Sequence, residues 1–201
     1  MRGLIGECGA VRKGARGLEI DSCGGFGSLE NMDVRKKEQL RALHAEAVVA
    51  YHAGCRIPAE VVSADGLKFL AMLGLDAQCL YDYADDFVRY GEPSVEVFLE
   101  VAEIRTSHFR SVLGGRDDGA AHLEAELPTK QAEFDGVAWL PRIIRKAQFF
   151  LEGRMPADIM YGCSGDRAFL SKFATGLPEF LRLVRDTGGD PAVILKAIRS
   201  K

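Results

Sequence analysis

The stretch Gly153-Arg154-Met155-Pro156-Ala157-Asp158 repeats, with one residue fewer, the earlier stretch Gly54-Cys55-Arg56-Ile57-Pro58-Ala59-Glu60. The similarity continues downstream, because Phe169-Leu170 corresponds to Phe69-Leu70 and Gly189-Asp190-Pro191 corresponds to Gly91-Glu92-Pro93. The spacing agrees as well, since the same number of positions separates Arg56 from Pro93 and Arg154 from Pro191. Self-similarity at a fixed spacing is the signature of a duplicated structural unit.

Helical patterns surround both copies of this stretch. Apolar residues recur at helical spacing from Asp33 until Gly54 ends the run, and again from Trp139 until Gly153. Capping residues and prolines then mark the starts of six further helices, at Ser63 (through Leu73), Asp76 (through about Arg89), Pro93 (through Gly114), Ser164, Pro178 and Pro191. We therefore predict an all-α protein built from two tandem, diverged copies of a four-helix module.

The predicted modules occupy residues 32–114 and 137–201. An acidic linker, residues 115–136, joins them and carries one short helix around His122 to Glu126. Residues 1–31 are glycine-rich and lack an apolar repeat, so we expect a flexible tail there. Inside each module, the arginine of the repeated loop is expected to close the loop ionically, Arg56 with Glu60 and Arg154 with Asp158.

The composition limits the partners of the chain. With 201 residues and 47% hydrophobic residues, the chain can bury a sizeable core, and its net charge of -3 disfavours nucleic acids and acidic membrane surfaces. The five cysteines contain no CxxC pair, and no segment is long and apolar enough for a membrane span. We expect a cytoplasmic protein with reduced thiols and with neither nucleic-acid nor membrane partners.

The densest group of reactive side chains is Tyr161-Gly162-Cys163-Ser164-Gly165-Asp166-Arg167, which leads into the helix beginning near Ser164. A thiol at a helix N-terminus with an arginine nearby is the usual setting of a nucleophilic cysteine, which makes Cys163 the candidate nucleophile. Tyr161 and Asp166 are candidate acid/base groups. The alternative is structural: Ser164 or Asp166 caps the helix and Cys163 is a small buried apolar residue.

A pair of cations distinguishes the second copy from the first. Arg142 and Lys146 are four residues apart on one helix face, at positions where the first copy has Leu43 and Ala47. Two cations near a helix N-terminus can hold an anionic ligand, with Trp139 and Arg167 completing the site. The alternative is a solvated polar face of an amphipathic helix.

Metal and cofactor chemistry is not expected. His44 and His52 lie eight positions apart on one helix and so point in different directions, and the sequence holds no Cys/His/carboxylate set with metal-ligand spacing. We predict neither a metal nor a cofactor.

The second copy resembles the bacterial domain-of-unknown-function family numbered 5069. The resemblance covers about residues 127–201, with 34–113 as a more diverged copy, and rests on Gly136-Val137-Ala138-Trp139-Leu140-Pro141-Arg142, Lys146-Ala147, Tyr161-Gly162-Cys163, Asp166-Arg167 and Phe169-Leu170, after a lead-in of Pro128 and Lys130. Ser164 departs from the family pattern, which usually has proline there. The resemblance implies a small helical unit in which these positions form one spatial cluster, and it implies no particular activity.

Three functions compete at this point. The first is a binding or regulatory module for a small anionic metabolite, with Trp139 and Tyr161 lining a pocket and Arg142 supplying charge. The second is a small cofactor-independent enzyme that uses Cys163, or Tyr161 and Asp166. The third is a structural interaction protein whose two copies imitate a homodimer. The sequence leaves the oligomeric state open.

Overall fold

The computed structural model describes residues 32–117 and 119–201, so the predicted glycine-rich tail lies outside the described residues. The described chain is mostly helical, which confirms the predicted all-α character. Its first part consists of α1 (Val34–His52), the short 3-10 helix η1 (Pro58–Glu60), α2 (Ala64–Met72), α3 (Ala77–Tyr90) and α4 (Val95–Ser111).

Side-chain caps fix the starts of these helices, as predicted for α2 and α3. Asp33, Ser63 and Asp76 each accept a hydrogen bond from a backbone N–H in the first turn of α1, α2 and α3. The start predicted at Pro93 is wrong by two residues. Ser94 is the cap of α4, because its Oγ accepts a hydrogen bond from the N–H of Val97.

The second part consists of α5 (Leu140–Glu152), α6 (Ser164–Ser171), α7 (Leu177–Thr187) and α8 (Pro191–Arg199). Between α4 and α5 lie the 3-10 helix η2 (Glu124–Glu126), within the predicted short helix, and a hairpin that the sequence analysis missed. Its strands, β1 (Glu133–Phe134) and β2 (Val137–Ala138), pair antiparallel through a turn at Asp135-Gly136, where both residues have positive φ. The predicted boundary between residues 136 and 137 lies in this turn.

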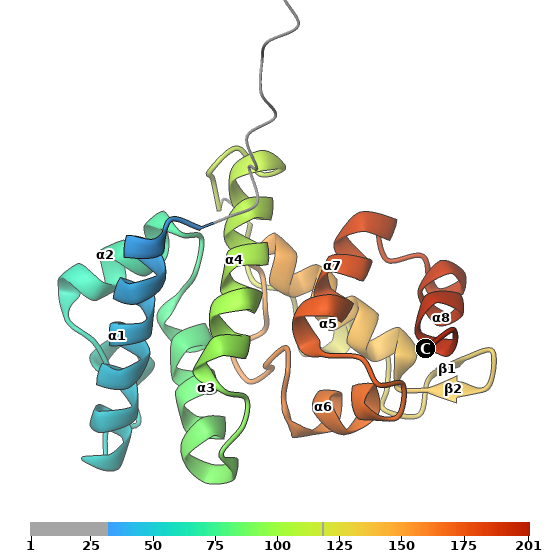
Figure 1. Ribbon diagram of the computed structural model, residues 1–201, viewed down its shortest axis with the longest axis horizontal. Helices are drawn as coiled ribbons and strands as arrows, with labels where there is room; N and C mark the ends of the chain where they lie inside the picture. Colours follow the sequence, from blue (N-terminus) through green and yellow to red (C-terminus); the bar gives the residue numbers. More distant parts are fainter. Residues whose placement is uncertain (1–31, 118) are drawn as a thin grey trace, which may run out of the picture.

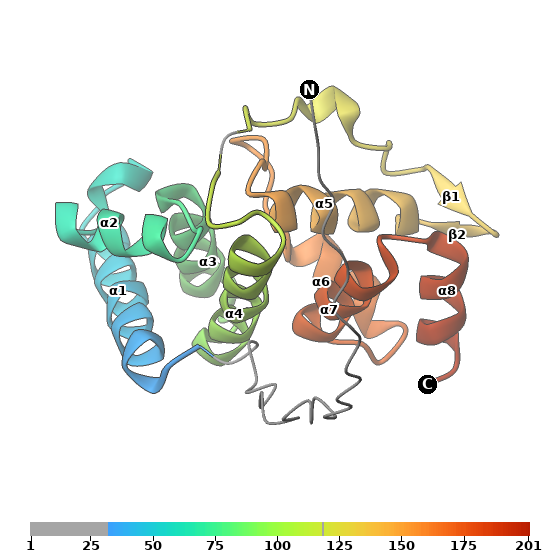
Figure 2. The same cartoon turned by 90° about the horizontal axis from the view of Figure 1, so that it is seen from above.

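The first four helices lie on one side of the molecule and the last four on the other (Figure 1). Helix α1 packs against α3 and α4, and α5 packs against α7 and α8, while α4 also contacts α5 and α7. One hydrophobic core therefore continues from Leu40 and Phe98 in the first half to Ile143 and Phe180 in the second. Residues 119–132, which precede β1, run along α5 (Figure 2).

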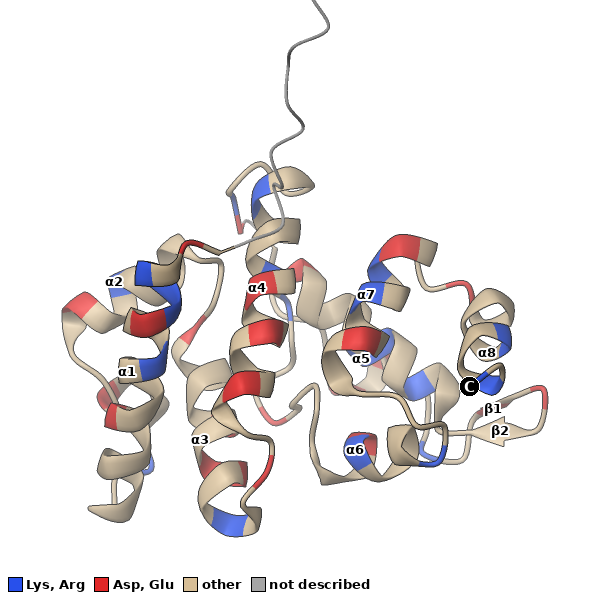
Figure 3. Ribbon diagram, viewed as in Figure 1, with Lys and Arg blue, Asp and Glu red and all other residues tan. Residues whose placement is uncertain are grey.

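Charge is distributed unevenly over the helices. Basic and acidic residues alternate along α1, whereas acidic residues predominate along the visible face of α4 (Figure 3).

The loop arginines do not make the ion pairs predicted for them. Arg56 instead donates to the carbonyls of Tyr51 and Cys55 and stacks over the Tyr51 ring, and Arg154 donates to the carbonyl of Ala120. Both arginines thus bind backbone carbonyls, Arg56 at the end of α1 and Arg154 in the segment between α4 and α5.

Candidate functional site

Asp166 is the centre of a buried polar network between α5 and α6. Its side chain is 0% exposed and accepts three hydrogen bonds: one from the Trp139 indole N–H at 3.0 Å, one from the Gly162 N–H at 2.9 Å and one from the Lys146 ammonium. A buried carboxylate needs such partners, because an unpaired charge in the protein interior is strongly unfavourable. The network therefore ties the start of α5 to the start of α6.

Trp139 is held in place from two sides. Its backbone has a φ of 74°, in the left-handed region, where it serves as the N-cap of α5. Its ring lies against Gly165, since a Cβ atom there would stand 2.8 Å from the indole. A non-glycine residue in this conformation costs free energy, and the hydrogen bond to Asp166 together with this close contact offsets that cost.

Lys146 joins the network to the thiol. Its Nζ lies 3.2 Å from Cys163 Sγ, and Cys163 is the N-cap of α6 with no side-chain hydrogen bond to the helix. The cation beside the thiol is thus Lys146 and not the predicted Arg167. Lys146 is 3% exposed and Arg142 is also buried, so the alternative of a solvated polar face on α5 is wrong.

A surface hollow of about 530 Å³ opens above this network. It lies between α3, α5, the start of α6 and the segment before it, and four of the predicted residues line it: Trp139, Arg142, Lys146 and Cys163. Arg142 donates to the carbonyl of Pro128 at 2.7 Å and lies 3.5 Å from the carboxylate of Glu124. Lys130 adds a third cation to the wall.

The other predicted residues lie away from the surface of this hollow. The Tyr161 hydroxyl donates to the Leu177 carbonyl in the core, and burial raises the pKa of Tyr161 well above its usual value. Arg167 pairs with Asp86 at 2.7 Å and also donates to the carbonyl of Gly162. Asp166 lies beneath the hollow with both oxygens hydrogen-bonded, so a ligand in the hollow meets Cys163 but neither Tyr161 nor Asp166.

The sequence analysis missed the acidic lining of the hollow, of which three residues come from α3. The lining carboxylates are Asp82, Asp85, Asp86, Glu124 and Asp158. Burial raises the pKa of Asp82 to about 7, although the hydrogen bond from Gln78 opposes this shift. Asp82, Asp85 and Asp86 lie close together on α3, but their place opposite α5 depends on tertiary packing.

The described residues contain no group of three or more His, Cys, Asp or Glu side chains that could hold a metal ion. Within the same residues, no helix has the length and apolar character needed to cross a membrane. The chain matches no family model, no curated protein and no solved structure.

Proposed function

We propose that the protein is a binding module for a small molecule with an anionic group, and that the ligand occupies the hollow between α3 and α5. Three cations and five carboxylates line this hollow. A purely anionic ligand would meet repulsion from α3, whereas a molecule that also carries an amine would match both walls. The ligand class favoured by the charges is therefore amphoteric.

The proposal rests mainly on the two contacts of the Arg142 guanidinium, one firm and one loose. One terminal nitrogen is fixed by the Pro128 carbonyl, which orients the guanidinium. The other faces Glu124, whose side chain is 64% exposed and only loosely paired at 3.5 Å. Arg142 is buried, but its partner Glu124 is exposed and distant, so a ligand carboxylate at closer range can replace Glu124 at small cost.

Thermal-shift measurements with 4-aminobutyrate, butyrate and butylamine test this proposal. The three molecules share one carbon chain and differ in charge, and we expect 4-aminobutyrate to raise the melting temperature most. Arg142→Ala should abolish that shift. Arg199→Ala is the matched control, because Arg199 pairs with Asp135 beside a different hollow. Equal responses in Arg142→Ala and the parent protein would remove Arg142 from the site.

A second candidate function is nucleophilic catalysis by Cys163, favoured by the 3.2 Å contact with Lys146. Alkylation by iodoacetamide, followed peptide by peptide with mass spectrometry, tests it. Cys55 is an internal control of similar partial burial. If Cys163 reacts no faster than Cys55 at neutral pH, nucleophilic catalysis by Cys163 is contradicted.

We also propose that the two halves arose by tandem duplication. The order of helices supports this, since α1 packs on α3 and α4 as α5 packs on α7 and α8. Ser63 and Cys163 also occupy the N-cap positions of α2 and α6. Membership of family 5069 belongs to the same proposal and is supported by the contacts among Trp139, Lys146, Cys163 and Asp166. An experimental structure in which α1–α4 and α5–α8 fail to superimpose would rule duplication out.

A cytoplasmic location is proposed as well. Cys55, Cys79 and Cys163 are all free thiols, as expected in a reducing compartment. Fractionation of the native host would test this location.

A further inference from the structure

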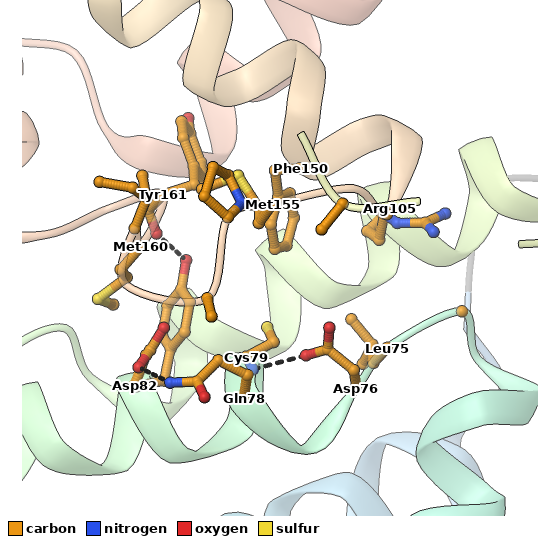
Figure 4. A pocket seen from close by; sticks show the side chains of 17 residues that line it. Leu75, Asp76, Gln78, Cys79, Asp82, Arg105, Phe150, Met155, Met160 and Tyr161 are labelled. Atoms are coloured by element: carbon orange, nitrogen blue, oxygen red, sulfur yellow. Dashed lines mark hydrogen bonds between the residues drawn. The ribbon is translucent and has the colours of Figure 1, made fainter. Parts of the chain in front are cut away.

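A separate cavity of about 210 Å³ lies between α3 and the segment that follows α5 (Figure 4). Its walls are largely apolar and come from both halves of the chain, with Leu75, Phe150, Met155 and Met160 among them. Methionine side chains are flexible and polarisable, so they adapt to apolar ligands of different shape. The sequence analysis assigned no role to this cavity.

Asp82 contributes a carboxyl group to the wall of this cavity. Gln78 donates a hydrogen bond of 2.7 Å to one of its oxygens, and the described residues provide Asp82 with no other hydrogen bond and no ion pair. Its neighbours on α3, Asp85 and Asp86, each pair with an arginine. Of these three acidic residues, Asp82 is therefore the one that has no cationic partner within the described part of the chain.

The pKa of Asp82 reflects this missing cation. Burial, which the hydrogen bond from Gln78 opposes, is the main cause that raises the pKa to about 7. The negative charges of Asp76, Asp85 and Asp86 contribute to the same shift. A positive charge close to the carboxyl group would favour its ionised form, so Asp82 is well suited to receive a cation.

Arg105 also lines the cavity, but it lies on the opposite side from Asp82 (Figure 4). Its guanidinium is ion-paired with the carboxylate of Asp117 at 3.7 Å, and Asp117 is not part of the cavity wall. The charge of Arg105 is thus compensated away from the cavity. Repulsion between Arg105 and a cation held at Asp82 is accordingly weak.

We propose that this cavity binds a small primary amine with an apolar body, whose ammonium group pairs with the Asp82 carboxylate. An ammonium group has three donors, and the carboxylate has acceptor positions beyond the one that Gln78 uses. The apolar walls receive the body of the ligand. A molecule of liquid water takes roughly 30 Å³, so the cavity has room for about seven atoms of that size. Linear amines of about six carbon atoms match this volume.

This inference does not rest on the proposed function, because Arg142 lines the hollow and not the cavity. The hollow and the cavity share Asp82, Ile159 and Met160 as a common wall. Asp85 lines only the hollow, so Asp85→Asn is the matched control for Asp82→Asn.

The experiment compares hexylamine with hexan-1-ol, which has the same chain and no charge, by ligand-observed NMR titration of the full-length protein at pH 8. At this pH an alkylamine is protonated, as a lysine side chain is, and Asp82 is mostly ionised. We expect hexylamine to bind at least about tenfold more tightly than hexan-1-ol. Asp82→Asn should remove this preference and leave hexan-1-ol binding unchanged, since the variant keeps the shape of the side chain. Asp85→Asn and Arg142→Ala should both retain the preference.

Equal affinity for hexylamine and hexan-1-ol in the parent protein would overturn the proposal, as would undiminished hexylamine binding by Asp82→Asn. Ethylamine tests the apolar walls, because each buried methylene group should tighten binding about fourfold. If hexylamine binds no more tightly than ethylamine, the apolar body does not enter the cavity and the proposal fails. Met155→Trp fills the cavity and should abolish hexylamine binding, so unchanged binding there would overturn the location.

Discussion

The Lys146 ammonium lies 3.2 Å from the Cys163 sulfur while it also pairs with the buried carboxylate of Asp166. One cation on α5 therefore contacts both the first residue before α6 and a residue in its first turn. The arrangement makes Lys146 a structural residue as well as a neighbour of the candidate nucleophile.

Lys146→Met should destabilise the protein by about 3–5 kcal/mol, because it leaves the Asp166 carboxylate buried without its cation. Urea denaturation measures the change. The matched control is Lys172→Met, at an exposed position, which should change the free energy of unfolding by less than about 0.5 kcal/mol. Similar small losses in both variants would show that the buried pair contributes little.

Gly165→Ala should destabilise the protein, although alanine is normally the better helix former by about 1 kcal/mol. The added Cβ would stand 2.8 Å from the Trp139 ring, so the indole must move away from Asp166. We expect a net loss of about 1–3 kcal/mol and a change in tryptophan fluorescence. The chain has a single tryptophan, so the emission reports on this contact alone. A stabilised variant with unchanged emission would contradict the contact.

The sequence predicted elements that depend on local signals. Ser63 and Asp76 cap their helices as predicted, because a short polar side chain needs only the next few N–H groups. The hairpin at Asp135-Gly136 was missed although Asp-Gly is a local turn signal, since its strands are only two residues long.

The site was predicted only where its residues belong to the second half. Trp139, Lys146, Cys163 and Asp166 do come together, as their shared pattern implied. Asp82 could not be assigned, because its place in the hollow arises from the packing of α3 against the second half. Arg167 was placed near the thiol by sequence proximity alone, but Asp86 holds it from another helix.

The free energy of unfolding should decrease as the pH falls below about 6.5, in part because of His44. Burial lowers the pKa of His44, whose ring lies between Phe87 and Phe98. The unfolded chain therefore binds the proton first, and acid favours unfolding as the pH falls below the ordinary histidine pKa.

His44→Phe should flatten this part of the stability profile, as measured by urea denaturation between pH 7 and pH 5. His108 will leave some slope of the same sign, since burial lowers its pKa as well. His52→Gln changes an exposed ring and serves as the control. A parent protein and His44→Phe variant with parallel profiles would contradict the assignment.

Asp82 should act in the opposite direction. Its folded-state pKa is raised from an ordinary value near 4 to about 7, so the folded chain holds this proton while the unfolded chain has released it. The stability it provides in its neutral form is therefore lost as the pH rises from about 4 to 7.

Asp82→Asn keeps the shape of the side chain and removes its titration. The variant should match the parent near pH 4.5 and exceed its stability at pH 8 by on the order of 2 kcal/mol, solvent screening of the half-buried carboxyl included. Asp65→Asn, at an exposed carboxylate that pairs with Lys68, is the control, and urea midpoints at the two pH values decide the comparison. An Asp82→Asn variant less stable than the parent at pH 8 would mean that the ionised carboxylate is favourable where it lies.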